Sequence, residues 1–185
     1  MRIAVYSGSF NPLHIGHLAI MEYLSKDRDY DWVYLVVSPK NPLKESISAE
    51  TGDERYLAAV EAVRRHPKLH VWVDDIEILM PPPQYTIRTL DALKLREPEN
   101  DFSLVIGADN LEGFRRWRDY RRILTEYGIV VYPRKGYDIQ GLHAALMEEN
   151  KDYKIDIIDA PIVDISSTEI REGIAAGRDM SEWLM

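Results

Sequence analysis

Two histidines, His14 and His17, stand three residues apart, between an apolar run and a helix-like segment. The run at residues 3–6 is typical of a buried strand, and the apolar residues of 18–24 fit a helix. Backbone N–H groups at a helix start lack partners, and the helix dipole there favours negative charge. Histidines at such a mouth can donate hydrogen bonds to phosphate oxygens that gain charge during a reaction. The segment 8–17 therefore predicts a site for nucleotide chemistry.

Other interpretations of the segment 8–17 are weaker. It lacks the Gly-x-Gly-x-x-Gly of dinucleotide-binding folds, and the Gly-Lys-Ser/Thr of a P-loop occurs nowhere in the chain. A zinc site would need more ligands than His14 and His17, but the chain has no Cys and no obvious third ligand nearby. We therefore expect no protein-held metal here. A tight turn with two incidental histidines is the simpler alternative.

Composition limits the function classes. The chain has 185 residues, 31 acidic and 23 basic side chains, a net charge of −8 and no Cys. This length fits a single domain, 1–185. The acidic balance is opposite to that of most nucleic-acid binders, so no nucleic-acid partner is expected. The sequence shows no signal peptide and no run long enough to span a membrane, which favours a cytoplasmic protein.

Five arginines between residues 115 and 122 break the acidic trend. On a helix they would spread around most of the circumference. The favoured interpretation is a solvated helix face with acidic neighbours. The alternative is that one or two of them attract anionic substrates.

Strand-like and helix-like runs alternate along the chain. We expect strands at 2–6, 32–37, 69–73, 102–106, 129–132 and 154–158, and further helices at 54–65, 86–96, 141–149 and 167–176. Loops should cover 38–42 and 80–84, and 177–185 should form a short closing turn. This order predicts an α/β fold: a Rossmann-like, doubly wound parallel sheet with helices on both faces. Ligands of such folds bind at the carboxyl ends of the strands.

The expected helices carry their own signals. In 54–65 the residues Leu57, Val60 and Val63 recur at helical spacing, with Asp53 as N-cap. In 86–96 the residues Ile87, Leu90 and Leu93 recur in the same way.

A second informative string is Ile-Ser-Ser-Thr-Glu-Ile-Arg at residues 165–171. Its plain interpretation is helix capping, with Ser166 or Ser167 as N-cap and Glu169 or Glu172 closing a capping box. Hydroxyls and free N–H groups at a helix start also bind phosphate, and Arg171 adds a charged fork.

The two strings resemble the paired signatures of nucleotidyltransferases, G-[ST]-F-[DN]-P-x-H-x-G-H and I-S-[SA]-T-x-I-R. The resemblance implies in-line attack by a substrate phosphate on the α-phosphorus of ATP, without an enzyme nucleophile. It implies Mg²⁺ held mainly by the ATP phosphates and water. His14, His17 and Arg171 would be catalytic. The implied ATP-binding residues are Gly8, Ser9, Phe10, His14, His17, Gly107, Asp109, Ser167, Thr168 and Arg171.

Three middle segments are similar to bacterial nicotinate-nucleotide adenylyltransferases. They are Pro-Gln-Tyr-Thr-Ile-Arg-Thr-Leu at 83–90, Ile-Gly-Ala-Asp-Asn-Leu at 106–111 followed by Phe114 and Trp117, and the Arg-x-Gly-Tyr of 131–137. By this resemblance the second substrate is nicotinate mononucleotide, bound by Lys44, Tyr85, Thr86, Trp117 and Arg134. The chain departs from the family at Leu43, where a histidine is common, and at Ser7, where a glycine is common.

Simpler interpretations exist for these middle residues. In these interpretations Thr86 only caps the following helix, Asp109 caps the helix near Leu111, and Trp117 only packs in the core. Alternative functions are a related adenylyltransferase acting on nicotinamide mononucleotide or phosphopantetheine, and a nonenzymatic nucleotide-binding regulator. Assembly into a homo-oligomer is left open.

Overall fold

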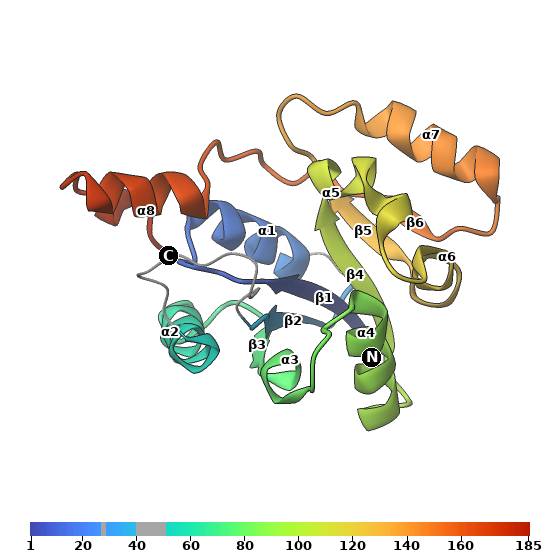
Figure 1. The fold of residues 1–185 in the computed structure, drawn as a ribbon, viewed down its shortest axis with the longest axis horizontal. Coiled ribbons are helices and arrows are strands. Elements are labelled where there is room, and N and C mark those ends of the chain that lie inside the picture. Colours follow the sequence, from blue (N-terminus) through green and yellow to red (C-terminus); the bar gives the residue numbers. More distant parts are fainter. Residues whose placement is uncertain (27–28, 40–50) are drawn as a thin grey trace.

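A computed structural model describes residues 1–26, 29–39 and 51–185. Its centre is one six-stranded, all-parallel sheet with the strand order β3-β2-β1-β4-β5-β6 (Figure 1). The strands are β1 (Arg2–Gly8), β2 (Trp32–Val37), β3 (Val71–Asp74), β4 (Asp101–Gly107), β5 (Ile129–Tyr132) and β6 (Ile155–Ile157). All six expected strands and the doubly wound α/β fold are confirmed.

The sheet has its topological switch at β1. This strand pairs with β2 on one side and with β4 on the other, so the chain winds outward in both directions from it. In open parallel sheets, ligands bind in the crevice at the carboxyl ends of the strands next to such a switch. The segment that follows β1 therefore lies at the expected binding place.

Helices join the strands. They are α1 (Ile15–Lys26), α2 (Gly52–Arg64), α3 (Ile76–Leu79), α4 (Thr86–Arg96), α5 (Ala108–Glu112), α6 (Tyr120–Arg122), α7 (Ile139–Glu149) and α8 (Ser167–Ala175). Short 3₁₀ turns occupy η1 (Phe114–Arg116) and η3 (Ser181–Trp183), and a π turn occupies η2 (Ile123–Tyr127). The turn η3 agrees with the closing turn expected near the end. None of the helices in the described ranges is long and apolar enough to cross a membrane.

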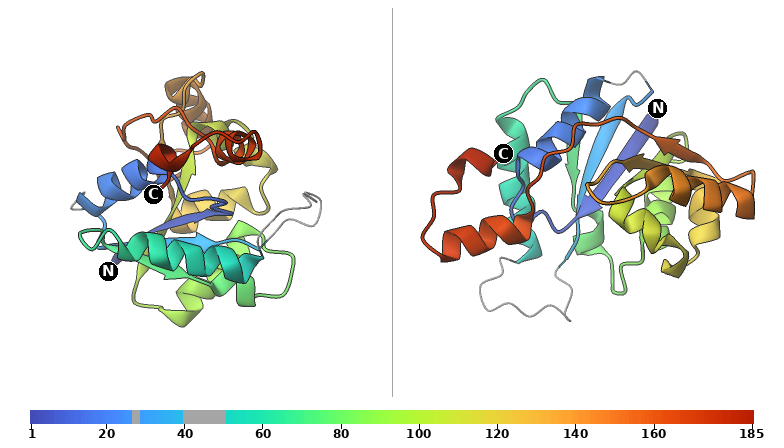
Figure 2. Two further views of the ribbon diagram at one scale, coloured as in Figure 1. Left: turned by 90° about the vertical axis from the view of Figure 1, so that its left-hand side faces the viewer. Right: turned by 90° about the horizontal axis from the view of Figure 1, so that it is seen from above.

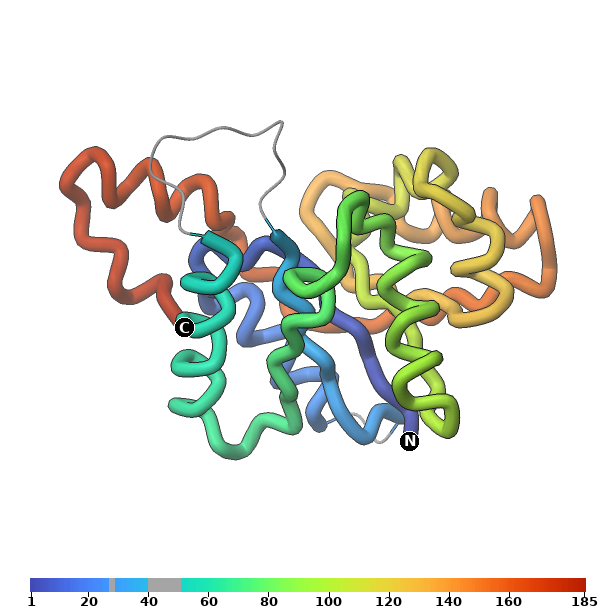
Figure 3. Tube along the Cα trace, turned by 60° about the horizontal axis from the view of Figure 1, so that its bottom comes forward, coloured from blue at the N-terminus to red at the C-terminus, as the bar shows by residue number. Residues whose placement is uncertain are grey.

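Both faces of the sheet are buried, which explains why its strands read as continuous apolar runs. On β1, Ala4 and Tyr6 belong to the core beneath α1 and α2, and Ile3 and Val5 to the core beneath α4, α5, η2 and α7. Figure 2 shows the two helix layers on either side of the sheet. Figure 3 shows α8 and α7 at opposite ends of the molecule.

The start and the buried face of α2 differ from the expectation. The N-cap is Thr51, not Asp53: its Oγ1 accepts the Glu54 N–H at 3.1 Å, and the Glu54 carboxylate accepts the Thr51 N–H at 2.8 Å. Of the apolar repeat, Leu57 is 62% exposed, whereas Val60 and Val63 are partly buried and pack against the core. The residues buried on the sheet are Arg55, Ala59 and Ala62. By contrast, Ile87, Leu90 and Leu93 of α4 are buried as expected.

The start of one strand also differs from the expectation. The strand β3 begins at Val71 rather than at Leu69, because the Leu69 N–H donates to the His66 carbonyl in a turn. Residues 80–84 lie between α3 and α4 and contain neither helix nor strand, as expected. The other expected loop, 38–42, falls mostly outside the described residues.

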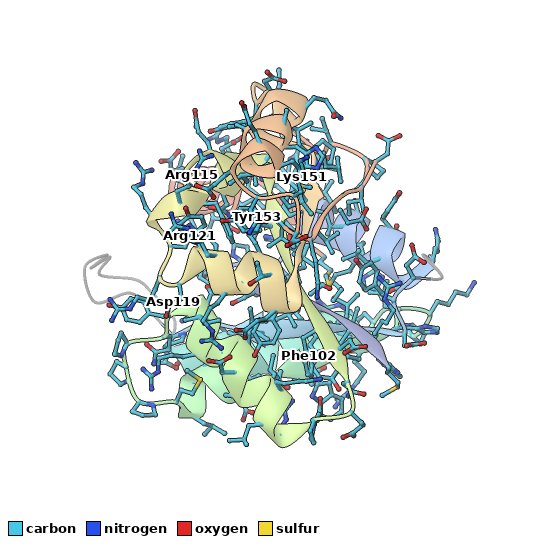
Figure 4. The ribbon with its side chains drawn as sticks, turned by 90° about the vertical axis from the view of Figure 1, so that its right-hand side faces the viewer. Phe102, Arg115, Asp119, Arg121, Lys151 and Tyr153 are labelled. Carbon is cyan, nitrogen blue, oxygen red and sulfur yellow. The ribbon has the colours of Figure 1, made fainter. Side chains whose placement is uncertain are left out.

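The arginine-rich segment is not one helix. Asp119 has a left-handed φ of 51°, and the segment breaks there between η1 and α6. Arg122 pairs with Asp91 at 3.1 Å and with Glu126 at 2.8 Å, and Arg115 pairs with Glu149 at 3.4 Å. Arg115 and Arg122 thus have acidic neighbours as expected, but the expected single helix face is wrong. Figure 4 shows Arg115, Asp119, Arg121, Lys151 and Tyr153 on this side of the molecule.

Candidate active site

The turn between β1 and α1 is held in an unusual backbone conformation. Phe10 has a φ of 48°, which is rare for a residue with a side chain, and its ring is 94% buried. The ring meets Tyr6 edge-on at 5.3 Å and His17 edge-on at 5.1 Å between centroids. A Cβ on Gly8 would lie 3.2 Å from the Phe10 ring. Packing therefore stabilises a strained turn, as is common at functional sites.

The backbone sets the tautomer of both histidines. His17 Nδ1 accepts the His14 N–H at 3.1 Å, and His14 Nδ1 accepts the Gly16 N–H at 3.0 Å. The two rings stack at 3.7 Å between centroids. Because each Nδ1 is an acceptor, the proton of each neutral ring is on Nε2. Each histidine can therefore donate one hydrogen bond to a ligand.

Both histidines are neutral near pH 7. Burial, assisted by the charge of Arg134, lowers the pKa of His14 from 6.5 to about 4. Burial lowers the pKa of His17 well below 6.5 as well, with smaller contributions from His14 and Arg134. Any charge stabilisation by these rings therefore comes from N–H dipoles rather than from imidazolium cations.

A pocket with a cavity volume of about 170 Å³ opens beside the histidines, at the carboxyl ends of β1, β4 and β5. Tyr6, both histidines, Asp109 and Arg134 are among its lining residues. Arg134 Nε lies 3.9 Å from Asp109 Oδ1. That Oδ1 is buried and accepts no hydrogen bond from any described residue. The pocket thus combines neutral donors, a cation and a carboxylate oxygen with room for a further donor.

Gly107 and Asp109 occupy the junction between β4 and α5. A Cβ on Gly107 would collide with Asp109 Oδ1, so only glycine permits this approach of the carboxylate. Gly107 is the N-cap, and Asp109 lies within the first turn of α5. The simple interpretation of Asp109 as the cap of a helix near Leu111 is therefore wrong.

The second string contacts the first. Ser167 Oγ donates to the Pro12 carbonyl at 2.9 Å, and Arg171 donates to the Asn11 carbonyl at 2.6 Å. Arg171 also donates to Thr168 Oγ1 at 3.2 Å. The start of α8 is thereby fixed against the turn that carries the histidines.

The expected cap of α8 is confirmed. Ser166 is its N-cap, and its Oγ accepts the Glu169 N–H at 3.1 Å. Thr168 and Arg171 are exposed, so both are available to a ligand.

The segments predicted to receive a pyridine ring lie outside the lining of the histidine pocket. Tyr85 is the N-cap of α4 and Thr86 its first residue, so Thr86 does not cap the helix. Trp117 is half-buried and packs on Phe114, with 4.9 Å between the ring centroids. Arg118 lies over the Tyr85 ring at 5.3 Å, which joins the two segments.

The structure thus groups the predicted residues into two sets. Arg134, which we expected at the mononucleotide, lies with the predicted ATP residues around the histidines. The other set holds Tyr85 and Trp117, linked by Arg118, which follows Trp117 and lies over the Tyr85 ring. Lys44 and the Leu43 departure fall outside the described residues.

Two charged residues at the site, Arg55 and Glu77, were missed. Their side chains are buried to 98% and 97%, and both bind groups at the ends of β1 and β2. A signal for Arg55 was present, because its spacing of four and seven residues from Ala59 and Ala62 places all three on one helix face. The short α3 gave no comparable signal for Glu77.

Comparisons with known proteins show the family of the chain. A sequence model of the cytidylyltransferase-like family matches residues 5–173. A probable nicotinate-nucleotide adenylyltransferase of Porphyromonas gingivalis is 40% identical over 184 residues, which cover 100% of this chain and 89% of that protein. A protein of the same name from Flavobacterium johnsoniae is 38% identical over 100% of this chain and 92% of its own.

The fold also has a solved counterpart. The nicotinic acid mononucleotide adenylyltransferase of Plasmodium falciparum, in its complex with NaAD, superimposes with a TM-score of 0.80. The alignment covers 99% of this chain and 90% of that chain at 19% identity, so it supports the fold alone.

Proposed function

Because the chain belongs to the cytidylyltransferase-like family and, within it, to the nicotinate-nucleotide adenylyltransferases, we propose that it adenylylates nicotinate mononucleotide. The adenylyl group comes from ATP, and the products are deamido-NAD and pyrophosphate, a step of NAD biosynthesis. The observation that carries the proposal is the pair of neutral Nε2–H donors at the carboxyl end of β1, with α8 fixed beside them.

The proposed reaction needs no enzyme nucleophile. A phosphate oxygen of the mononucleotide attacks the α-phosphorus of ATP, and the bond from that phosphorus to the bridging oxygen of the β-phosphate breaks. The electron pair leaves with pyrophosphate. His14 and His17 donate from Nε2 to phosphate oxygens on which negative charge grows. Ser167, Thr168 and Arg171 hold the outer phosphates, and alignment of the two substrates supplies the remaining rate enhancement.

The two groups of residues suggest two substrate halves. Gly8, Ser9 and Phe10 form the turn that approaches the nucleotide of ATP, and Gly107 and Asp109 extend this contact from β4. On the other side, Trp117 stacks on the pyridine ring of the mononucleotide, while Tyr85 and Thr86 face its carboxylate.

Arg134 belongs to the ATP half. Its distance of 3.9 Å from Asp109, in the histidine pocket, supports a contact to a phosphate rather than to the pyridine ring. A contact from Lys44 stays a prediction.

Magnesium fits this site as a partner of the phosphates. Among the described residues, no three His, Cys, Asp or Glu side chains gather as a metal site. The ion would therefore be held mainly by ATP phosphates and water, with Asp109 as one carboxylate of the pocket beside the histidines. When bound, Mg²⁺ neutralises phosphate charge and assists the departure of pyrophosphate.

The test is pyrophosphate release from Mg·ATP with one acceptor at a time. We expect release with nicotinate mononucleotide, and at least about 100-fold lower kcat/KM with nicotinamide mononucleotide or phosphopantetheine. Equal release with another acceptor would favour the related transferases. ATP binding without release with any acceptor would favour a nucleotide-binding regulator. A cytoplasmic location and the absence of a nucleic-acid partner stay predictions. Assembly into a homo-oligomer is left open.

A further inference from the structure

Glu77 of α3 is a buried carboxylate that three hydroxyl groups approach. Ser38 Oγ donates to it at 2.6 Å, Thr89 Oγ1 at 2.9 Å and Ser7 Oγ at 3.2 Å. Ser7 is in β1, Ser38 directly follows β2 and Thr89 is in α4. One side chain thus joins two strand ends to the helix that begins at Thr86.

Arg55 of α2 holds the same region from the other layer. Its guanidinium donates to the carbonyl oxygens of Ser9 and Ser38, each at 2.7 Å. Arg55 and Glu77 therefore meet at Ser38, one at its carbonyl group and the other at its hydroxyl group. We call Arg55, Glu77, Ser7, Ser38 and Thr89 the strand-end network.

Stability alone does not explain why this network contains two buried charged side chains. Burying a charged group in place of an apolar side chain of similar volume brings little or no net stability, even when it is hydrogen-bonded. A buried, hydrogen-bonded charge does fix the direction of the groups that bind it. The groups fixed here belong to the proposed site or adjoin it. Ser7 precedes Gly8, Ser9 is in the turn between β1 and α1, and Thr89 lies three residues after Thr86 on the same helix.

We infer that Glu77 and Arg55 are positioning residues for the adenylyl transfer. Glu77 fixes the turn between β1 and α1, which we propose to bind ATP, relative to the start of α4, where the ring of the mononucleotide would bind. Arg55 fixes the turn itself through Ser9. This inference rests on the proposed function, because in-line transfer requires both substrates to be aligned to a fraction of an ångström.

Kinetics of hydroxyl deletions provide the first test. Ser7→Ala should raise the KM for ATP at least threefold and leave the KM for nicotinate mononucleotide unchanged. Thr89→Val should raise the KM for nicotinate mononucleotide at least threefold and leave the KM for ATP unchanged. Glu77→Gln keeps the shape but replaces one acceptor oxygen with an NH₂ group, so it should affect both substrates and lower kcat roughly 10- to 100-fold.

Asn100→Ala is the matched control. Asn100 is as buried as Glu77, with 3% exposure, and it accepts a hydrogen bond from the Met1 amino group at the opposite end of the sheet. Its loss should lower the unfolding temperature and leave kcat and both KM values close to those of the wild type. The same kinetic pattern in Glu77→Gln and Asn100→Ala, or unchanged KM values in Ser7→Ala and Thr89→Val, would overturn the inference.

Hydrogen exchange tests the network without any substrate. In Glu77→Gln and Arg55→Lys, amides of residues 7–13 should exchange at least tenfold faster than in the wild type, while those of β5 keep their rates. In Asn100→Ala the amides of 7–13 should keep wild-type rates. Unchanged exchange at 7–13 in both network variants would refute positioning. A wild type that releases no pyrophosphate would instead refute the proposed function, and the exchange data would still decide on the network.

Discussion

Lowering the pH from 7 to 5 should destabilise the protein through His14. Its pKa is about 4 in the folded state and 6.5 when unfolded. Between these values the unfolded chain binds more protons than the folded one, so the free energy of unfolding falls as the pH falls. Stability from this residue is complete above pH 6.5 and is lost progressively towards pH 4. His17 acts in the same direction, because its pKa is also lowered.

The size of the effect follows from the two pKa values. For values of 6.5 and about 4, the linkage relation gives a loss of about 2 kcal/mol at pH 5 for His14. Solvent at the mouth of the pocket screens part of this, so we expect about 1–2 kcal/mol.

The assay is urea unfolding at both pH values, with His14→Asn as the comparison. The Asn Oδ1 can accept the Gly16 N–H as His14 Nδ1 does, but the side chain does not titrate. Groups distant from residue 14 titrate alike in both proteins and cancel, and His17 keeps burial as the main cause of its lowered pKa. The variant should therefore lose about 1–2 kcal/mol less than the wild type. Equal losses would refute the reasoning. So would nitrogen chemical shifts of His14 that place the proton on Nδ1 at pH 7.

Four further changes test the catalytic and binding assignments. His17→Ala should fold normally and lower kcat about 10²- to 10³-fold, because one Nε2–H donor is lost; unchanged turnover in a pyrophosphate assay would make His17 structural. Arg171→Ala should raise the KM for ATP about tenfold and weaken ATP binding in calorimetry, and unchanged binding would contradict its phosphate contact. Thr86→Pro keeps the helix start but removes one N–H donor, so the preference for the acid over the amide mononucleotide should fall about tenfold in kcat/KM. Trp117→Ala should weaken the binding of the acid and the amide mononucleotide alike. A change in the ratio of their kcat/KM values would show that Trp117 contributes to the preference for the acid.

Much of the fold could be predicted from the sequence because burial on both faces gives an unbroken apolar run. Ile3 to Tyr6 is such a run, and its strand lies at the centre of the sheet. The helix face of α2 could not be predicted in the same way. Its apolar residue Leu57 is exposed, whereas the buried Arg55 looked like a surface residue. A charged side chain enters a core only where tertiary structure supplies acceptors, and these come from residues distant in sequence.

The site was predictable in its residue types but not in its protonation. His14 and His17 stood out by spacing and context, yet nothing in the sequence showed that backbone N–H groups approach both Nδ1 atoms. The sequence also did not show which site residues lie close together. Arg134 lies near Asp109 only because β4 and β5 are neighbours in the sheet. Such proximity follows from strand order, which local patterns do not contain.

The contact between α8 and the histidine turn affects the order in which the protein matures on the ribosome. The strands β1 to β5 and the two histidines precede α8 in the chain, so most of the sheet can assemble while α8 is still inside the exit tunnel. Ser167 and Arg171, which attach to Pro12 and Asn11, are translated more than 150 residues later. During synthesis the turn that carries the histidines is therefore made long before the segment that we propose to bind the outer phosphates of ATP.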